Sequence, residues 1–186
     1  MDPKLIIVIA VVIVALLVGI WAVMRNRRHR TVVLQQSFGP EYDRVVKEQG
    51  PGRAEIILEA RQKRVEKFHL RSLTVDERER FISSWRSVQS RFVDDPAGAV
   101  GEADLLVTQL MQLRGYPMSD FDQRAEDISV HYPRVVDNYR AAREVALRHQ
   151  RGEATTEDLR NSMIYYRSLF DELLETNTVP VKREVA

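Results

Sequence analysis

TVDERERFISSWRSVQSRFVDDP, residues 74–96, contains the signals for one complete helix and for the start of the next. Thr74 and Glu77 match a capping box, in which the two side chains satisfy free amides at a helix start. Apolar side chains then follow at spacings of four, three and four residues, the repeat of one helix face: Phe81, Trp85, Val88 and Phe92. We expect these four side chains to share one buried face.

The same stretch ends with the start signals of a second helix. Asp95 is placed as an N-cap and Pro96 as a first-turn residue, and the pattern continues to Gly115. Its apolar positions form two neighbouring rows, one with Ala99, Ala103, Leu106, Leu110 and Leu113 and one with Val100, Val107 and Met111. An apolar face of that width predicts a helix at the centre of a bundle, with Leu106 and Leu110 buried.

Helical patterns continue toward both ends. On the N-terminal side lie residues 32–49, interrupted at Gly39-Pro40, and residues 53–68, in which Glu59 and Lys63 form an i,i+4 pair.

On the C-terminal side we expect a short helix capped by Ser119, a helix that begins at Pro133 and a last helix capped by Thr155 or Thr156. No strand pattern or internal repeat stands out. The fold class is therefore all-α, with a soluble bundle of five to seven helices.

The N-terminus carries a different kind of segment. Residues 5–24, LIIVIAVVIVALLVGIWAVM, contain no charged side chain. As a helix they reach roughly 30 Å, the thickness of the bilayer hydrocarbon core. A secretory signal is the main alternative, but its apolar stretch is shorter and ends in a small-x-small site, which is lacking here. A buried core helix is less consistent with a segment that is apolar around its whole circumference. We predict one transmembrane helix.

Charge asymmetry predicts the orientation of this helix, because Lys and Arg beside a span stay on the cytoplasmic side. Only Lys4 precedes the span, whereas Arg25, Arg27, Arg28 and Arg30 follow it. The N-terminus should face outward and residues 31–186 should lie in the cytoplasm.

The predicted organisation has five parts. Residues 1–4 form an extracytoplasmic N-terminus, 5–24 the span, 25–52 a basic juxtamembrane segment with a connecting helix, 53–175 the cytoplasmic helical domain, and 176–186 a disordered tail.

The charge balance outside the anchor argues against nucleic-acid binding. Of 28 Lys and Arg and 27 Asp and Glu, five cations and one acid lie in the first 30 residues, which leaves 23 against 26. A nucleic-acid-binding surface is normally basic and interleaved with aromatic side chains. The absence of cysteine excludes disulfides and zinc–thiolate sites.

One acidic series could suggest a metal site: Asp120, Asp122, Glu126 and Asp127, with His131 following. Counted from Asp120, an EF-hand loop would need glycine at its sixth position and glutamate at its twelfth, but the chain has Ala125 and His131 there. First-turn acids also stabilise a helix dipole without any metal.

No other residue pattern supports a catalytic site. The four histidines are scattered, no nucleophile elbow or phosphate-binding glycine loop occurs, and the pair Asp94-Asp95 is explained by helix capping. We therefore assign no catalytic residue, cofactor or metal ligand.

Several short strings resemble a widespread group of uncharacterised bacterial proteins that pair one N-terminal hydrophobic segment with an arginine-rich helical domain. They are FGPEYDR (38–44), RFVDDP (91–96), GYP (115–117), FDQRA (121–125) and FDELL (170–174). The resemblance implies a bacterial source and the inner membrane, and it carries no activity.

Two functions remain in view. The first is an interaction or scaffolding module, held in the bilayer by residues 5–24, that recruits a protein partner at the membrane. The second is an enzyme or small-molecule sensor with a pocket inside the bundle, but the predicted helix faces offer few convergent polar groups for that.

Overall fold

The computed structural model describes residues 17–19, 21, 24–25 and 29–175. Residues 29–38 are helical, and seven labelled helices follow. They are α2 (Pro40–Gln49), α3 (Pro51–Val65), α4 (Val75–Arg91), α5 (Pro96–Leu113), α6 (Phe121–His131), α7 (Val136–Gln150) and α8 (Thr156–Glu175). The described chain contains no strand, so the all-α prediction is confirmed. With residues 29–38 included, the helical segments slightly outnumber the five to seven expected.

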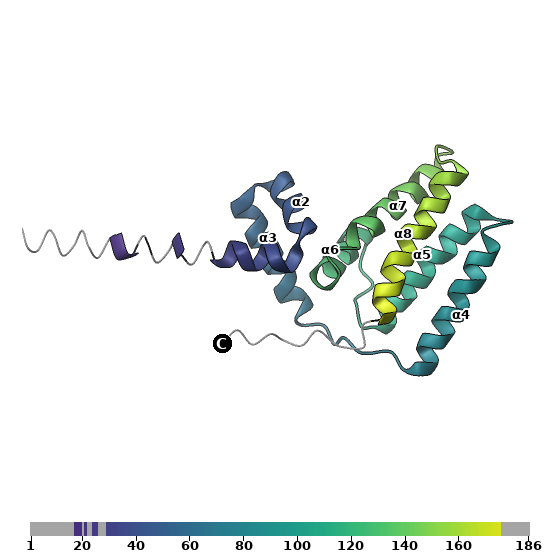
Figure 1. Ribbon diagram of the computed structural model, residues 1–186, viewed down its shortest axis with the longest axis horizontal. Coiled ribbons are helices and arrows are strands. Elements are labelled where there is room, and N and C mark those ends of the chain that lie inside the picture. The colour runs from purple at the N-terminus through teal and green to yellow at the C-terminus, as the bar shows by residue number, and fades with distance from the viewer. Residues whose placement is uncertain (1–16, 20, 22–23, 26–28, 176–186) are drawn as a thin grey trace, which may run out of the picture.

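The main core lies among α4, α5, α6, α7 and α8 (Figure 1). α5 packs against α4, α7 and α8, while α8 packs against α5 and α7, so these two helices share the central position. Trp85, Val88, Leu106 and Leu110 are buried as expected. Phe81 and Phe92 are only partly buried at the edge of the core.

A second, smaller core joins residues 29–38 to α2 and α3. Its buried side chains are Leu34, Phe38, Tyr42, Val45, Ala54 and Leu58. α3 in turn packs against α6, which connects this unit to the main bundle. The boundary predicted between residues 52 and 53 falls within the first turn of α3, and α3 shares this smaller core with α2.

The helix starts predicted at Thr74, Asp95 and Thr155 are confirmed, because each of these side chains accepts a hydrogen bond from an amide three residues further on. The Thr74 hydroxyl accepts from the amide of Glu77, the Glu77 carboxylate accepts from the amide of Thr74, and Asp95 accepts from the amide of Gly98. Thr155 caps α8 by accepting from the amide of Asp158 at 3.1 Å.

Two predicted starts are wrong. Asp120, not Ser119, caps α6, because its carboxylate accepts from the amide of Gln123. α7 begins at Val136, not Pro133, because the amides of Val135 and Val136 both close a turn onto the carbonyl of Tyr132.

Most of the predicted span, residues 5–24, lies outside the described residues, as do residues 1–4 and the tail 176–186. Leu17, Val18, Trp21 and Met24 are described and exposed. Within the described part of the chain, no helix combines the length and apolar character needed to cross a membrane. The transmembrane helix therefore stays a prediction.

Candidate interaction groove

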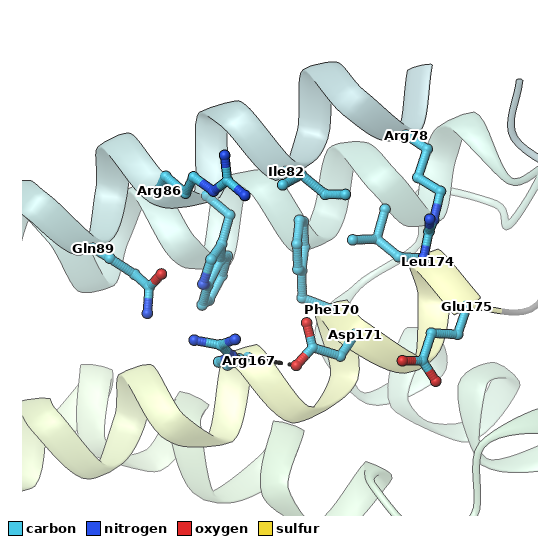
Figure 2. Close-up of a pocket in the computed structure, with 10 residues that line it drawn as sticks. Arg78, Ile82, Arg86, Gln89, Arg167, Phe170, Asp171, Leu174 and Glu175 are labelled. Atoms are coloured by element: carbon cyan, nitrogen blue, oxygen red, sulfur yellow. Dashed lines mark hydrogen bonds and ion pairs between the residues drawn. The ribbon is translucent and has the colours of Figure 1, made fainter. Parts of the chain in front are cut away.

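A groove runs between α4 and α8 on the outside of the bundle (Figure 2). α4 contributes Arg78, Ile82, Trp85, Arg86 and Gln89, and α8 contributes Arg167, Phe170, Asp171, Leu174 and Glu175. We call this surface the α4/α8 groove. The two helices run antiparallel along it, with Arg86 and Arg167 near one end and Arg78 and Leu174 near the other.

The helical repeat explains this set of residues. On α4, Trp85 and Val88 point into the core. Residues on the adjacent side of the same helix, spaced three or four positions apart, therefore stay accessible to solvent. Arg78, Arg86 and Gln89 are exposed and Ile82 is half-buried on that edge.

The floor of the groove is aromatic. The Trp85 and Phe170 rings are stacked, with centroids 4.6 Å apart and an interplanar angle of 23°. The indole Nε1 of Trp85 is buried and has no hydrogen-bond partner among the described residues. The stacked pair gives the groove a rigid, packed base, although the two rings are only 4 % and 1 % exposed, and the half-buried Ile82 supplies accessible apolar surface above it.

The rim is charged and mostly basic. Arg167 Nε donates to Asp171 Oδ2 at 3.3 Å. Arg78 and Arg86 form no ion pair within the described part of the chain. Unpaired guanidinium groups beside an apolar floor suit an anionic, partly apolar ligand.

The hollow measures about 240 Å³. Small-molecule sites usually enclose roughly 300–1,000 Å³ and surround their ligand. This groove is open along the surface of two helices, so it fits protruding side chains of a macromolecule better than an enclosed metabolite.

A second polar feature joins the N-terminal unit to the bundle. The carboxylate of Glu41 on α2 is fully buried and accepts hydrogen bonds from Arg44, Arg61 and Arg140 at 2.6 to 3.0 Å. Burial raises the pKa of Glu41, but the hydrogen bonds and charges of Arg44 and Arg140 outweigh it and lower the pKa to about 2.

The same network continues to α6. Arg61 also donates to Glu126 at 2.9 Å, and Arg64 donates to Glu126 at 3.0 Å and to Asp127 at 2.8 Å. The network holds α2 and α3 against α6 and α7. Its carboxylates all pair with arginines, and only the buried Nε of Arg61 has no partner among the described residues, so we interpret the network as a structural link and not as a ligand site.

These contacts account for the acidic series in the sequence. Asp120 caps α6, Asp122 lies in its first turn, and Glu126 and Asp127 pair with arginines of α3. No group of three or more His, Asp or Glu in the described chain could hold a metal ion.

His131 forms a separate, partly buried pair with Tyr116. Its Nδ1 lies 2.7 Å from the Tyr116 hydroxyl. Burial, together with the charge of Arg114, lowers the pKa of His131 to about 4, and burial raises the pKa of Tyr116. The imidazole is therefore neutral near pH 7.

The structure describes two of the four arginines of the predicted membrane flank, Arg25 and Arg30. Arg27 and Arg28 lie outside the described residues. The guanidinium of Arg25 lies 5.3 Å from the Trp21 ring centroid, and Arg30 pairs with Glu59 of α3 at 2.9 Å. Glu59 thus pairs across helices and not with Lys63 as expected.

Comparisons with known proteins identify no relative: no protein-family model, curated protein or solved structure matches the chain. The resemblance to the bacterial group described above stays a prediction.

Sequence reasoning did not single out the α4/α8 groove. The sequence predicts Trp85 as a core residue, and Arg78 and Arg86 belong to none of the motifs identified in it. The available signal was their spacing, because Arg78, Ile82 and Arg86 follow one another at four-residue intervals beside the apolar stripe.

Proposed function

We propose that the protein is a single-pass membrane protein whose helical domain is a protein-docking module, with the α4/α8 groove as its docking surface. The observation that carries this proposal is the combination of a stacked Trp85–Phe170 floor with two arginines, Arg78 and Arg86, that have no ion-pair partner in the described chain. Arginine is among the side-chain types most often responsible for binding energy at protein interfaces, and the buried ring pair gives these arginines a rigid base.

The anchor in this proposal is residues 5–24. Twenty uncharged residues followed by Arg25, Arg27, Arg28 and Arg30 support a span with its C-terminal side in the cytoplasm. Trp21 next to Arg25 fits the end of such a span, where tryptophan and arginine meet the headgroups.

A tether at the membrane makes a modest groove effective. Confining the domain to a thin layer raises its effective concentration toward other membrane-associated proteins. A contact that is weak in free solution can then be occupied.

Site-specific photocrosslinking in the native membrane tests the docking surface. A photoreactive amino acid replaces Gln89, an exposed residue of the groove, or Ser87, an exposed residue of the same helix outside it. We expect a discrete crosslinked protein from position 89 that disappears with Arg86→Glu, and none from position 87. Identical patterns from both positions would reject the groove as the docking surface.

Reporter fusions test the orientation. A cytoplasm-active and a periplasm-active reporter are fused in turn to the C-terminus, with a variant in which Arg25, Arg27, Arg28 and Arg30 are replaced by glutamine as control. We expect activity of the cytoplasmic reporter in the parent. Activity of the periplasmic reporter alone would show that the domain is translocated.

A further inference from the structure

The two walls of the α4/α8 groove differ in charge. The α4 wall carries two arginines and no acidic group, whereas the α8 wall carries Arg167 beside Asp171 and ends with Glu175 (Figure 2). Asp171 already holds Arg167. Anionic groups of a ligand are therefore attracted to α4 and repelled by the acids of α8.

The two arginines of α4 are separated by a fixed distance. Arg78 and Arg86 are eight residues apart, which corresponds to about 12 Å along the axis of an α-helix. Ile82 lies midway between them on the same edge, and Phe170 lies beside it across the groove. The surface thus presents a cation, an apolar patch and a second cation in line.

An α-helix can match this order of groups with its own repeat. Residues at i and i+7 or i+8 of a helix lie on one face about 10 to 12 Å apart, and a residue at i+3 or i+4 lies between them on that face. A free phosphate or a lipid headgroup can neutralise one arginine, but it brings no apolar group to Ile82 and Phe170.

Resting on the docking function proposed above, we infer that the partner of the α4/α8 groove is an amphipathic helix with two carboxylates seven or eight residues apart and an apolar residue between them. The carboxylates pair with Arg78 and Arg86, and the apolar side chain enters the groove over Ile82 and Phe170. This is helix-in-groove recognition with an acidic helix.

Synthetic helical peptides test the spacing on the full chain, reconstituted in nanodiscs of a zwitterionic lipid. The matched peptide has glutamates at i and i+7 and a leucine at i+4 in an alanine and glutamine background. The control peptide has the same composition, with the glutamates at i and i+5, which places them on different faces. By fluorescence anisotropy we expect the matched peptide to bind at least about tenfold more tightly.

Charge reversal tests the contacts. Arg78→Glu with Arg86→Glu should reduce binding of the matched peptide to the level of the control peptide. A peptide with lysines at i and i+7 should then bind this doubly substituted protein more tightly than it binds the parent. Arg53→Glu with Arg80→Glu makes the same change in net charge at exposed positions outside the groove and should leave binding unchanged.

The outcomes separate this inference from the docking function. Equal affinities of the two glutamate peptides for the parent chain would overturn the inferred spacing of the two carboxylates. This comparison uses only the parent chain, so it does not depend on whether the variants fold. Binding of neither peptide, while photocrosslinks still form from position 89, would overturn the acidic helix and leave the docking function standing. The absence of any crosslink from position 89 in the protein with Arg78 and Arg86 intact would remove the docking function itself.

Discussion

Arg61 Nη1 donates a 2.6 Å hydrogen bond to Glu41 Oε1, and both side chains are buried between α2 and α3. Arg140 of α7 reaches the same carboxylate from 99 residues further along the chain. One carboxylate therefore joins three helices, and its loss leaves the guanidinium groups of Arg44, Arg61 and Arg140 close together without it in a region of low dielectric constant.

Glu41→Gln should lower the free energy of unfolding by about 3 to 5 kcal/mol near neutral pH, because it removes the central charge of a buried network. Urea unfolding of residues 29–175, followed by circular dichroism, measures this. Glu48→Gln is the matched control, since Glu48 pairs with Arg44 at 2.6 Å but is half-exposed, and should cost at most about 1 kcal/mol.

The stability lost in Glu41→Gln should depend on pH in a defined way. The pKa of Glu41 is about 2 in the folded chain, below its ordinary 4.5, so its stabilisation is complete above about pH 4.5. That stabilisation is lost as the pH falls from 4.5 toward 2. The difference in stability between the parent and Glu41→Gln should therefore shrink over this range, and a difference that stays constant would show that the carboxylate is not the source.

His131 should destabilise the fold at mildly acidic pH. Its pKa is lowered from 6.5 to about 4, so the unfolded chain binds a proton that the folded chain excludes. Stability should decrease as the pH falls from 6.5 to 4, by at most about 1.4 kcal/mol per pH unit from this group. His131→Gln should remove this slope in unfolding curves measured across the range, whereas His149→Gln, at the exposed end of α7, should keep it.

Trp85→Ala should cost about 3 to 5 kcal/mol, because the indole is 4 % exposed and stacks on Phe170. Trp85→Phe keeps an aromatic ring at the floor of the groove and should cost less. Denaturant unfolding compares the two variants. A loss below about 1 kcal/mol for the alanine variant would mean that the ring does not support the core.

Gly115→Ala should be destabilising for two reasons. Gly115 has φ +95°, which side chains disfavour, and an added Cβ would lie 2.4 Å from the carbonyl oxygen of His69. We expect a loss of about 1 to 3 kcal/mol. Gly101→Ala is the control, since Gly101 lies within α5 with open space around its Cβ, and should gain about 0.5 to 1 kcal/mol. Thermal melting of both variants measures the contrast.

The helices and their caps were predictable because their signals are local. Thr74 and Glu77 are three residues apart, and Trp85 and Val88 belong to one repeat. The predicted helix start at Pro133 was wrong although its signal is also local. The carbonyl of Tyr132 accepts from the amides of both Val135 and Val136, so residues 133–135 form a turn and the helix begins at Val136.

The contacts that join the helices could not be predicted in this way. Nothing near Glu41 indicates Arg140, and Glu59 had an apparent partner in Lys63 although it pairs with Arg30. The α4/α8 groove depends on which edge of α4 meets α8, and that follows from packing across the whole bundle. For this reason Arg78 and Arg86 do not stand out in the sequence.

Two truncations test whether the N-terminal unit is part of the folded domain. A fragment of residues 29–175 keeps Leu34, Phe38 and Glu41, and we expect it to fold as a helical, cooperatively melting protein without a metal or cofactor. A fragment of residues 53–175, which begins at the domain boundary predicted from the sequence, lacks these side chains.

The shorter fragment would expose the apolar face formed by Ala54 and Leu58 and would leave Arg61 and Arg140 without the Glu41 carboxylate. It should melt at a lower temperature and with less cooperativity, because arginines that lose the buried Glu41 carboxylate and keep only Glu126 and Asp137, together with an uncovered core, destabilise the folded state. Circular dichroism melting of both fragments, each with and without a chelator, measures this. Equal melting temperatures would show that residues 29–52 contribute nothing to the stability of the bundle, and a loss of folding on chelation would reopen the acidic series of α6 as a metal site.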